Sequence, residues 1–114
     1  MSPITTHVLD TSSGRPAAGV PISLAKLGSD GTWQELANGI TDDDGRIKDL
    51  LPSDHPLATG IYRMTFATET YFASQAVKGF YPMVPVIFDL QSPATHYHIP
   101  LLLSPFGYST YRGS

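Results

Sequence analysis

The segment VPISLAKLGSDGTWQELA, residues 20–37, decides the fold class of this chain. Between Val20 and Leu27 apolar and polar residues alternate, as they do in a β-strand that buries only one of its faces. The GSDG sequence at residues 28–31 is typical of a hairpin loop, and a returning strand is expected over residues 32–37. A strand, a turn and a returning strand predict an antiparallel β-sheet.

The same pattern of short strands and turns continues on both sides of this segment. Residues 41–45, TDDDG, predict a second strong turn, and a first turn is expected over residues 12–16. One short helix is predicted over residues 70–77, with Thr70 as its N-cap and Gly79 at its end. Seven or eight short strands and one small helix predict an all-β sandwich. The remaining strands are predicted over residues 4–10, 61–67, 84–90 and 95–103, with a last extended piece over residues 108–112.

The strand pattern also predicts how individual residues lie. The alternation over residues 61–67 places Tyr62, Met64 and Phe66 on the core side. Pro85 and Pro100 fall inside predicted strands, and neither has an N–H group to donate. We therefore expect both prolines at sheet edges, at bulges or at positions without a ladder hydrogen bond.

Length and composition limit the classes of function. A chain of 114 residues fits a single domain, residues 1–114. Charged residues make up 15%, against about 25% in an average domain, which suggests that another subunit covers part of the surface. The net charge is −3 and no basic run occurs, so no nucleic-acid partner is expected. No apolar run approaches the roughly 18 residues of a membrane span, so no membrane partner is expected either.

The absence of cysteine and the sequence near both ends bear on the compartment. Without cysteine there is no disulfide framework, thiol nucleophile or thiolate metal site. Residues 1–7 do not have the basic and apolar regions of a secretory signal. Residues 112–114, RGS, are not a peroxisomal signal. We expect a cytoplasmic protein.

Two histidines at a spacing of two are the first candidates for chemistry. On a strand, the side chains of His96 and His98 project to the same face, with Cα atoms about 7 Å apart. Such a pair can bind a metal, perform acid–base catalysis or form part of a polar surface. A metal site would need a third ligand, which His7 or His55 would have to supply.

His7, Arg46 and the C-terminal residues complete the candidates. His7 is opposite in phase to Val8, so it points out of the sandwich if Val8 points into the core. Arg46 follows the aspartate-rich turn, whose spacing does not fit an EF-hand calcium loop. The polar, aromatic residues 108–114 read either as a loose tail or as a segment attached to the apolar strand before them.

These motifs together resemble one family. The stretches HYHIPLLLSP (96–105) and YSTYRGS (108–114) are similar to the signature of 5-hydroxyisourate hydrolases, the transthyretin-related enzymes of urate breakdown. Residues 6–10, 14–17 and 41–46 also resemble that family. The sequence differs from it at residues 82–84, Pro-Met-Val, where the family often has Pro-Glu-Val or Pro-Glu-Ile.

The resemblance implies both an architecture and an activity. The implied fold is a transthyretin-like sandwich of two four-stranded sheets, assembled as a homotetramer with active sites at subunit interfaces. The implied reaction is hydrolysis of 5-hydroxyisourate to 2-oxo-4-hydroxy-4-carboxy-5-ureidoimidazoline, without a cofactor or a metal. The catalytic residues implied by the resemblance are His7, Arg46, His98 and Ser114. The implied substrate-binding residues are His7, Arg46, Tyr111, Arg112 and Gly113.

The chemistry of a ring amide suggests a role for each implied residue. Water must be activated by a base, and histidine suits that task near neutral pH. We favour His98 over His7 as the base, although either fits, and the role of His96 stays open. Arg46 would bind substrate and developing charge. Ser114 would orient a histidine through its hydroxyl or its terminal carboxylate.

Three other functions are compatible with parts of the sequence. A non-catalytic carrier like transthyretin would share the sandwich and the tetramer. A zinc hydrolase would use His7, His96 and His98 as ligands. An immunoglobulin-like adhesion module would explain the strands but not the C-terminal motif.

Overall fold

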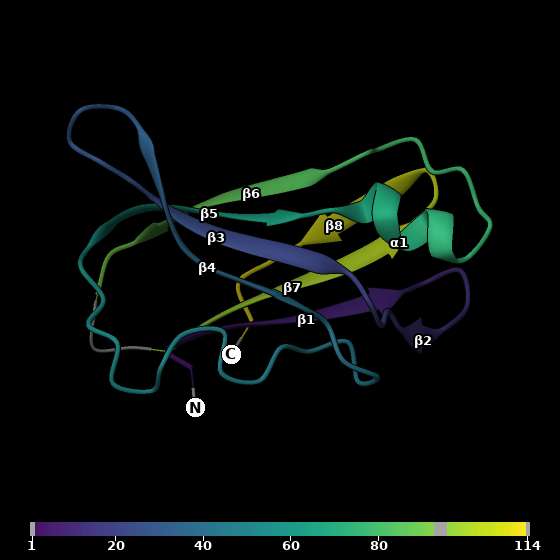
Figure 1. Ribbon diagram of the computed structural model, residues 1–114, viewed down its shortest axis with the longest axis horizontal. Helices are drawn as coiled ribbons and strands as arrows, with labels where there is room; N and C mark the ends of the chain where they lie inside the picture. Colours follow the sequence, from purple (N-terminus) through teal and green to yellow (C-terminus); the bar gives the residue numbers. More distant parts are fainter. Residues whose placement is uncertain (1, 93–95, 114) are drawn as a thin grey trace.

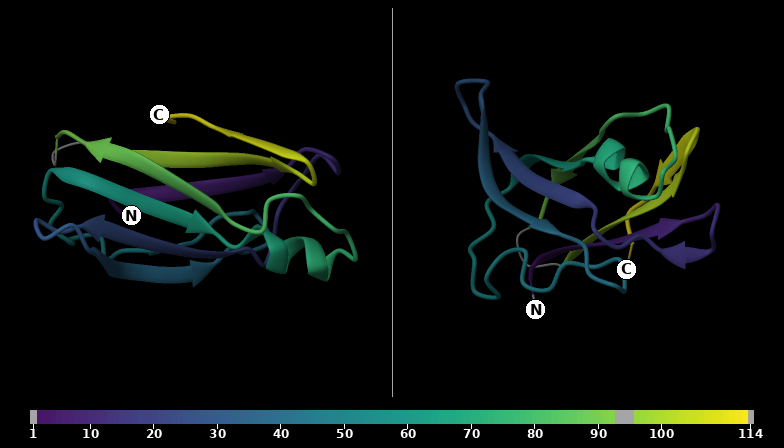
Figure 2. Two further views of the ribbon diagram at one scale, coloured as in Figure 1. Left: turned by 90° about the horizontal axis from the view of Figure 1, so that it is seen from above. Right: turned by 45° about the vertical axis from the view of Figure 1, so that its right-hand side comes forward.

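The computed structural model describes residues 2–92 and 96–113, which form two four-stranded sheets packed face to face (Figure 1). The side view in Figure 2 shows the sheets as two layers. One sheet has the strand order β2-β1-β7-β8 and the other has the order β4-β3-β5-β6. The predicted all-β sandwich of two four-stranded sheets is confirmed. The elements are β1 Ile4–Asp10, β2 Arg15–Pro16, β3 Pro21–Leu27, β4 Trp33–Ile40, β5 Gly60–Phe66, α1 Thr68–Ser74, β6 Val84–Leu90, β7 Tyr97–Ser104 and β8 Gly107–Thr110.

The hairpin that decides the fold class forms as predicted. Strands β3 and β4 are antiparallel, and Leu27 pairs with Trp33 beside the loop. Within the loop, the Gly28 N–H donates a 2.7 Å hydrogen bond to the carbonyl of Thr32. Strand β3 also pairs with β5, so it lies in the interior of its sheet.

One pairing joins the two ends of the sequence. Strand β1 runs parallel to β7 over its whole length, from Ile4 beside Tyr97 to Asp10 beside Leu103. A parallel pair needs a long connection between its strands, and here the connection contains the whole second sheet. The N-terminal strand therefore lies directly beside the strand that carries His98, and His96 lies just before that strand rather than within it as predicted.

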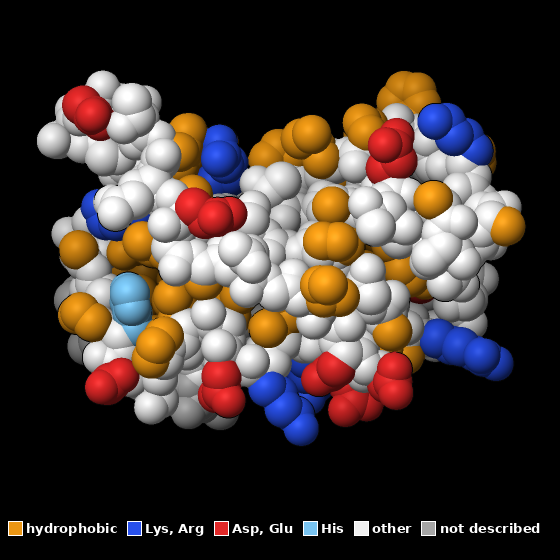
Figure 3. Space-filling view, viewed as in Figure 1, with side chains coloured by type: hydrophobic (Ala, Val, Ile, Leu, Met, Phe, Trp, Pro, Cys, Tyr) orange, Lys and Arg blue, Asp and Glu red, His pale blue; other side chains and the backbone are white. Residues whose placement is uncertain are grey.

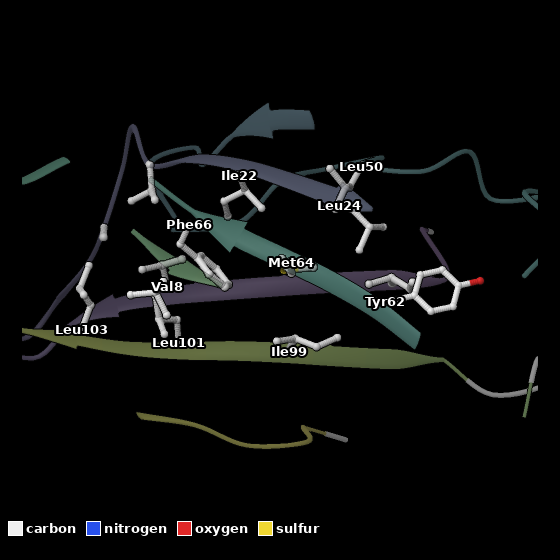
Figure 4. Close-up of a cluster of buried hydrophobic side chains, with 14 of the residues drawn as sticks. Val8, Ile22, Leu24, Leu50, Tyr62, Met64, Phe66, Ile99, Leu101 and Leu103 are labelled. Atoms are coloured by element: carbon white, nitrogen blue, oxygen red, sulfur yellow. The ribbon is translucent and has the colours of Figure 1, made fainter. Parts of the chain in front are cut away.

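The core lies between the sheets and follows the predicted alternation (Figure 4). Strand β5 buries Tyr62, Met64 and Phe66, each at most 1% exposed, and leaves the residues between them half-buried. Strand β3 and the residue before it contribute Val20, Ile22 and Leu24, as expected. Burying side chains of this size stabilises the fold by about 1.5–3 kcal/mol each.

The predicted helix boundaries are wrong. The helix is Thr68–Ser74 rather than residues 70–77, and its N-cap position is held by Ala67 and not by Thr70. Tyr71 and Phe72 are both buried and fix the helix against the core. The helix ends well before Gly79, because Ala76 takes a left-handed conformation (φ 58°) that the turn pattern of the sequence did not indicate.

The structure also tests the predictions made for the two strand prolines and for the turn over residues 12–16. Pro85 lies in β6 at a sheet edge, as predicted. Pro100 lies in the interior strand β7, but β7 pairs with β8 only from Leu101 onward, so it lies outside that ladder. The expected turn over residues 12–16 was wrong at its end, since Arg15–Pro16 pair with β1 as strand β2. No helix in the described part of the chain is long and apolar enough to span a membrane.

A buried carboxylate ties the helix to the first sheet. Asp10 at the end of β1 is 5% exposed and accepts a 2.6 Å hydrogen bond from the hydroxyl of Tyr71. Burial raises the pKa of the Asp10 carboxyl, but hydrogen bonds from Ser12, Tyr71 and Ser13 outweigh burial and place the pKa below its ordinary 3.8. The ionised form is therefore the one that stabilises the fold.

Replacing Tyr71 by Phe should lower the free energy of unfolding by about 1–3 kcal/mol, because a buried charged acceptor loses a donor. The loss should be complete above pH 3.8 and should shrink as the pH falls through the lowered pKa of Asp10. Urea unfolding at several pH values measures it. Tyr62→Phe is the control, since its hydroxyl donates to the neutral carbonyl of Ala58 and its loss should not depend on pH in this range. Equal pH dependence in the two variants would contradict the prediction.

Candidate active site

The predicted site residues of the two paired strands lie on one outward sheet face. Along β1 the burial alternates, with Thr6 and Val8 buried and Thr5 and His7 half-buried. Because Val8 points into the core, the prediction that His7 points out of the sandwich is confirmed. In β7 the half-buried His98 lies between buried neighbours, and it is the register partner of Thr5. The alternation of each strand and the register between them bring these side chains together.

The turn before Arg46 docks this arginine beside His7. The Val8 N–H donates a 2.8 Å hydrogen bond to the carbonyl of Gly45, and His7 and Arg46 form an isolated antiparallel bridge. The Asp42 carboxylate accepts hydrogen bonds from the backbone N–H groups of Arg46 (3.1 Å) and Asp44 (2.9 Å). These bonds, led by the one from Arg46, hold the pKa of the Asp42 carboxyl below its ordinary value. Asp42 therefore organises the turn. Figure 3 shows charged side chains along the edge of the molecule where Figure 1 places this segment.

A glycine is required at the point where this turn meets β1. Gly45 has a φ of +75°, in the left-handed region that side chains disfavour. A Cβ atom there would overlap the Val8 carbonyl oxygen and lie 3.3 Å from Cδ2 of His7. The turn can approach β1 this closely only because residue 45 has no side chain.

The C-terminal residues are attached to β7 and do not form a loose tail. The Gly113 N–H donates a 2.8 Å hydrogen bond to the carbonyl of His98, and a Cβ atom at Gly113 would overlap the His98 ring. The Arg112 guanidinium lies over the ring of Tyr97, 4.7 Å from its centroid. Tyr111 is 59% exposed. Ser114, for which a catalytic role was predicted, lies outside the described residues.

The surroundings of His98 change the pKa of its imidazole. Burial lowers its pKa below the ordinary 6.5, and electrostatic interactions with His96, His7 and Arg46 lower it further. The neutral form, which can accept a proton, is therefore favoured near neutral pH. A base needs this property.

One residue of the site was missed by the sequence analysis. The hydroxyl of Thr5 lies 2.8 Å from Nδ1 of His98 and 2.9 Å from Nε2 of His96. The two imidazole rings are 6.5 Å apart and nearly parallel, with 23° between their planes. Thr5 lies two residues before His7 on the same strand face, and this spacing was the only signal that the sequence contained.

Some of the residues predicted to form one site lie in two clefts that meet at His98, whereas His7 and Gly113 line neither cleft. The larger cleft, of about 520 Å³, is lined by Thr5, Arg46, His96 and His98 together with Ser2, Thr6, Ile47, Lys48 and Asp49. A second cleft of about 320 Å³ contains Tyr97, His98 and Ile99 with the segment 110–112 and part of β6. Tyr111 and Arg112 therefore lie on the other side of His98 from Arg46.

The described residues contain no group of three or more His, Cys, Asp or Glu side chains arranged to hold a metal ion. His55, which was considered as a third ligand, lies in a turn where its N–H donates to the Pro52 carbonyl, and it lines neither cleft. His96 and His98 are instead bridged by a hydroxyl.

Comparison with known proteins places the chain in a family. A model of the HIUase/Transthyretin family matches residues 4–113. The chain belongs to this family. It is 47% identical over 111 residues to 5-hydroxyisourate hydrolase of Salmonella typhimurium, and the match covers 97% of this chain and 80% of the relative. The resemblance stated from the motifs is confirmed.

Solved structures in the same family share the fold. The 5-hydroxyisourate hydrolase of Klebsiella pneumoniae superposes with a TM-score of 0.82 at 38% identity, covering 97% of this chain and 92% of that one. Sea bream transthyretin in complex with thyroxine superposes with a TM-score of 0.88 at 35% identity, covering 97% and 94%. The same sandwich is therefore found in a protein named as a hydrolase and in a transthyretin that binds thyroxine.

Replacing Gly45 by Ala should destabilise the protein by several kcal/mol for two reasons. The alanine would have to adopt a left-handed backbone conformation, and its methyl group would overlap the Val8 carbonyl oxygen. Gly14→Ala is the matched control: Gly14 has nearly the same φ, +73°, but a Cβ atom there meets nothing within 4 Å. We expect the control to cost only the backbone strain of about 1–2 kcal/mol. Urea unfolding of both variants measures the difference, and equal losses would show that contact with β1 is unimportant.

Proposed function

We propose that this protein hydrolyses 5-hydroxyisourate to 2-oxo-4-hydroxy-4-carboxy-5-ureidoimidazoline, a step of urate degradation. The observation that carries the proposal is a half-buried imidazole with a lowered pKa, His98, in a cleft that it shares with Arg46. The names of the relatives in Salmonella typhimurium and Klebsiella pneumoniae support the same reaction.

The proposed mechanism assigns the base to His98. A water molecule attacks the ring carbonyl carbon, and the neutral imidazole takes the proton that this water loses. The ring of His98 is held at Nδ1 by Thr5 and along its edge by the backbone of Gly113, so the nitrogen left for this task is Nε2. His7 lies on the same sheet face and stays the alternative base.

Arg46 is proposed to bind the substrate and its developing charge. Its guanidinium group is exposed, lies in the cleft with His98 and carries a permanent positive charge. As the carbonyl carbon becomes tetrahedral, negative charge grows on its oxygen, and a cation already in place stabilises that charge. The ring nitrogen leaves with a proton, which protonated His98 can return.

We also propose a homotetramer with active sites at subunit interfaces. The low charged content of 15% supports it, as do large hydrophobic side chains that the single chain leaves exposed. These include Phe80 (68% exposed), Met83 (57%), Ile87 (61%), Phe106 (76%) and Tyr111 (59%). Light scattering after size-exclusion chromatography tests the assembly. The cytoplasmic location expected from the sequence stays a prediction.

A small-molecule carrier is the second candidate, because sea bream transthyretin in complex with thyroxine shares the fold. Fold similarity alone does not separate the two functions. The larger cleft is lined by two histidines and by charged groups at Arg46, Lys48 and Asp49. Such a lining favours the binding of a polar, hydrogen-bonding ring over an apolar ligand.

The deciding experiment follows the ultraviolet absorbance of freshly generated 5-hydroxyisourate, made from urate by urate oxidase. We expect this protein to accelerate the decay, equally with and without a chelator. His98→Asn should reduce kcat/KM by about 10²–10⁴-fold, the usual contribution of a general base. His55→Asn, outside both clefts, is the control and should keep full activity. A folded protein that does not accelerate the decay would overturn the proposal and favour the carrier.

The pH profile provides a separate prediction. The base acts in its neutral form, and burial places the pKa of His98 below 6.5. We therefore expect kcat/KM to decrease toward low pH as His98 becomes protonated, with the midpoint of this decrease below pH 6.5. Steady-state rates between pH 5 and 8 measure this limb. A decrease that is already half complete above pH 6.5 would contradict the assignment of His98.

A further inference from the structure

The hydroxyl of Thr5 lies between two imidazole nitrogens. Its Oγ1 atom is 2.8 Å from Nδ1 of His98 and 2.9 Å from Nε2 of His96, and both distances are those of good hydrogen bonds. The parallel register that pairs Thr5 with His98 creates this arrangement, since paired residues of the two strands share a sheet face. The motif and the family resemblance gave Thr5 no role.

A hydroxyl carries one proton, and this couples the two rings. If Thr5 donates to one imidazole nitrogen, it can only accept from the other, because a hydroxyl has one donor and two acceptor lone pairs. When both imidazoles are neutral, the tautomer of His98 and the tautomer of His96 are therefore fixed together. In one arrangement Nε2 of His98 carries a lone pair, and in the opposite arrangement it carries a proton.

We propose that Thr5 is a positioning residue for His98. Its hydroxyl accepts a hydrogen bond from His98 Nδ1–H and donates its own proton to His96 Nε2. This arrangement leaves the lone pair on His98 Nε2, where a base needs it to take a proton from water. His96 is the end of the chain of hydrogen bonds and sets the direction of the Thr5 hydroxyl.

The surroundings of His98 favour this direction. The edge of its ring lies so close to Gly113 that a Cβ atom there would overlap it, and the Gly113 N–H donates to the His98 carbonyl. His96 is exposed, so its own Nδ1–H group can be hydrated. When His98 gains a proton at Nε2, its Nδ1–H still has an acceptor in Thr5, and a hydrogen bond to a charged group is the stronger kind.

Charged groups face His98 from several elements. His7 lies on β1, Arg46, Lys48 and Asp49 lie on the segment that follows β4, and Arg112 follows β8. Thr5→Val leaves all of these charges in place. A change in the titration of His98 in this variant would therefore report the lost hydroxyl and not a change of net charge.

The assignment rests on the proposed function for its catalytic consequence, but the hydrogen-bond arrangement can be measured without substrate. Long-range ¹H–¹⁵N spectra of labelled protein distinguish the two tautomers of a histidine. We expect His98 to be the Nδ1–H tautomer in the wild-type protein at neutral pH. In Thr5→Val we expect the Nε2–H tautomer and a lower pKa of His98, because the cation loses its acceptor. Thr5→Ser should preserve the wild-type tautomer.

His96→Phe tests the direction of the chain of hydrogen bonds. Without the acceptor at His96, the Thr5 hydroxyl is free to turn and donate to His98, so the fraction of Nδ1–H tautomer should fall. A wild-type tautomer in both Thr5→Val and His96→Phe would overturn the proposal. So would the Nε2–H tautomer of His98 in the wild-type protein.

Kinetics with 5-hydroxyisourate test the consequence for the reaction. Thr5→Val should lower kcat about tenfold and leave KM nearly unchanged. The loss should be smaller than that of the base itself, because the variant keeps His98 and only removes the group that positions it. Thr5→Ser should restore kcat to within about threefold of the wild-type value. The control Thr65→Val makes the same change on the other sheet, in β5, and should have no effect. Its thermal unfolding and that of Thr5→Val show whether each variant is folded.

The two proposals fail in different ways. An inactive wild-type protein with the expected tautomers would overturn the hydrolase and leave the Thr5 arrangement standing. An active wild-type protein whose Thr5→Val variant keeps kcat and the wild-type tautomer would overturn the role of Thr5 and leave the hydrolase standing.

Discussion

The parallel pairing of β1 with β7 is the constraint on which the site depends. It joins residues more than 90 positions apart in the sequence and sets Thr5 beside His98. A slip of one residue would move the outward side chains of one strand into the core, since strand side chains alternate with a period of two. The buried residues Val8 and Leu101, which are also register partners, oppose such a slip. The packing of the core therefore fixes the geometry of the groups that do chemistry on the other face.

Two glycines set how closely other segments approach this pair of strands. Gly45 brings the turn that carries Arg46 against β1, and Gly113 brings the C-terminal residues against the ring of His98. Neither glycine has a functional group that could react. Their contribution is the space that a missing side chain leaves, so a residue can serve the site without contact with a substrate.

How far the sequence predicts the structure depends on whether a feature is local. Alternation predicts which side chains are buried along β5 and along β3 as far as Leu24, but beyond it a register shift between Leu24 and Ala25 leaves both residues buried. The helix was misplaced because the packing of Tyr71 and Phe72 and the left-handed Ala76, not the cap residues, decide where it begins and ends. Thr5 was missed because its partners, His98 on β7 and His96 just before it, are distant in the sequence, and no local pattern specifies a register.

The sandwich separates the residues that stabilise from those that react. In β7 the buried Tyr97 and Ile99 pack into the core, while His98 between them faces outward. A substitution at an outward position changes the chemistry of the face and leaves the packed layer in place. This explains why one architecture is shared by a protein named as a hydrolase and another in complex with thyroxine. The function of a member of this family must therefore be inferred from the outward residues of β1 and β7 and from the segments that dock on them.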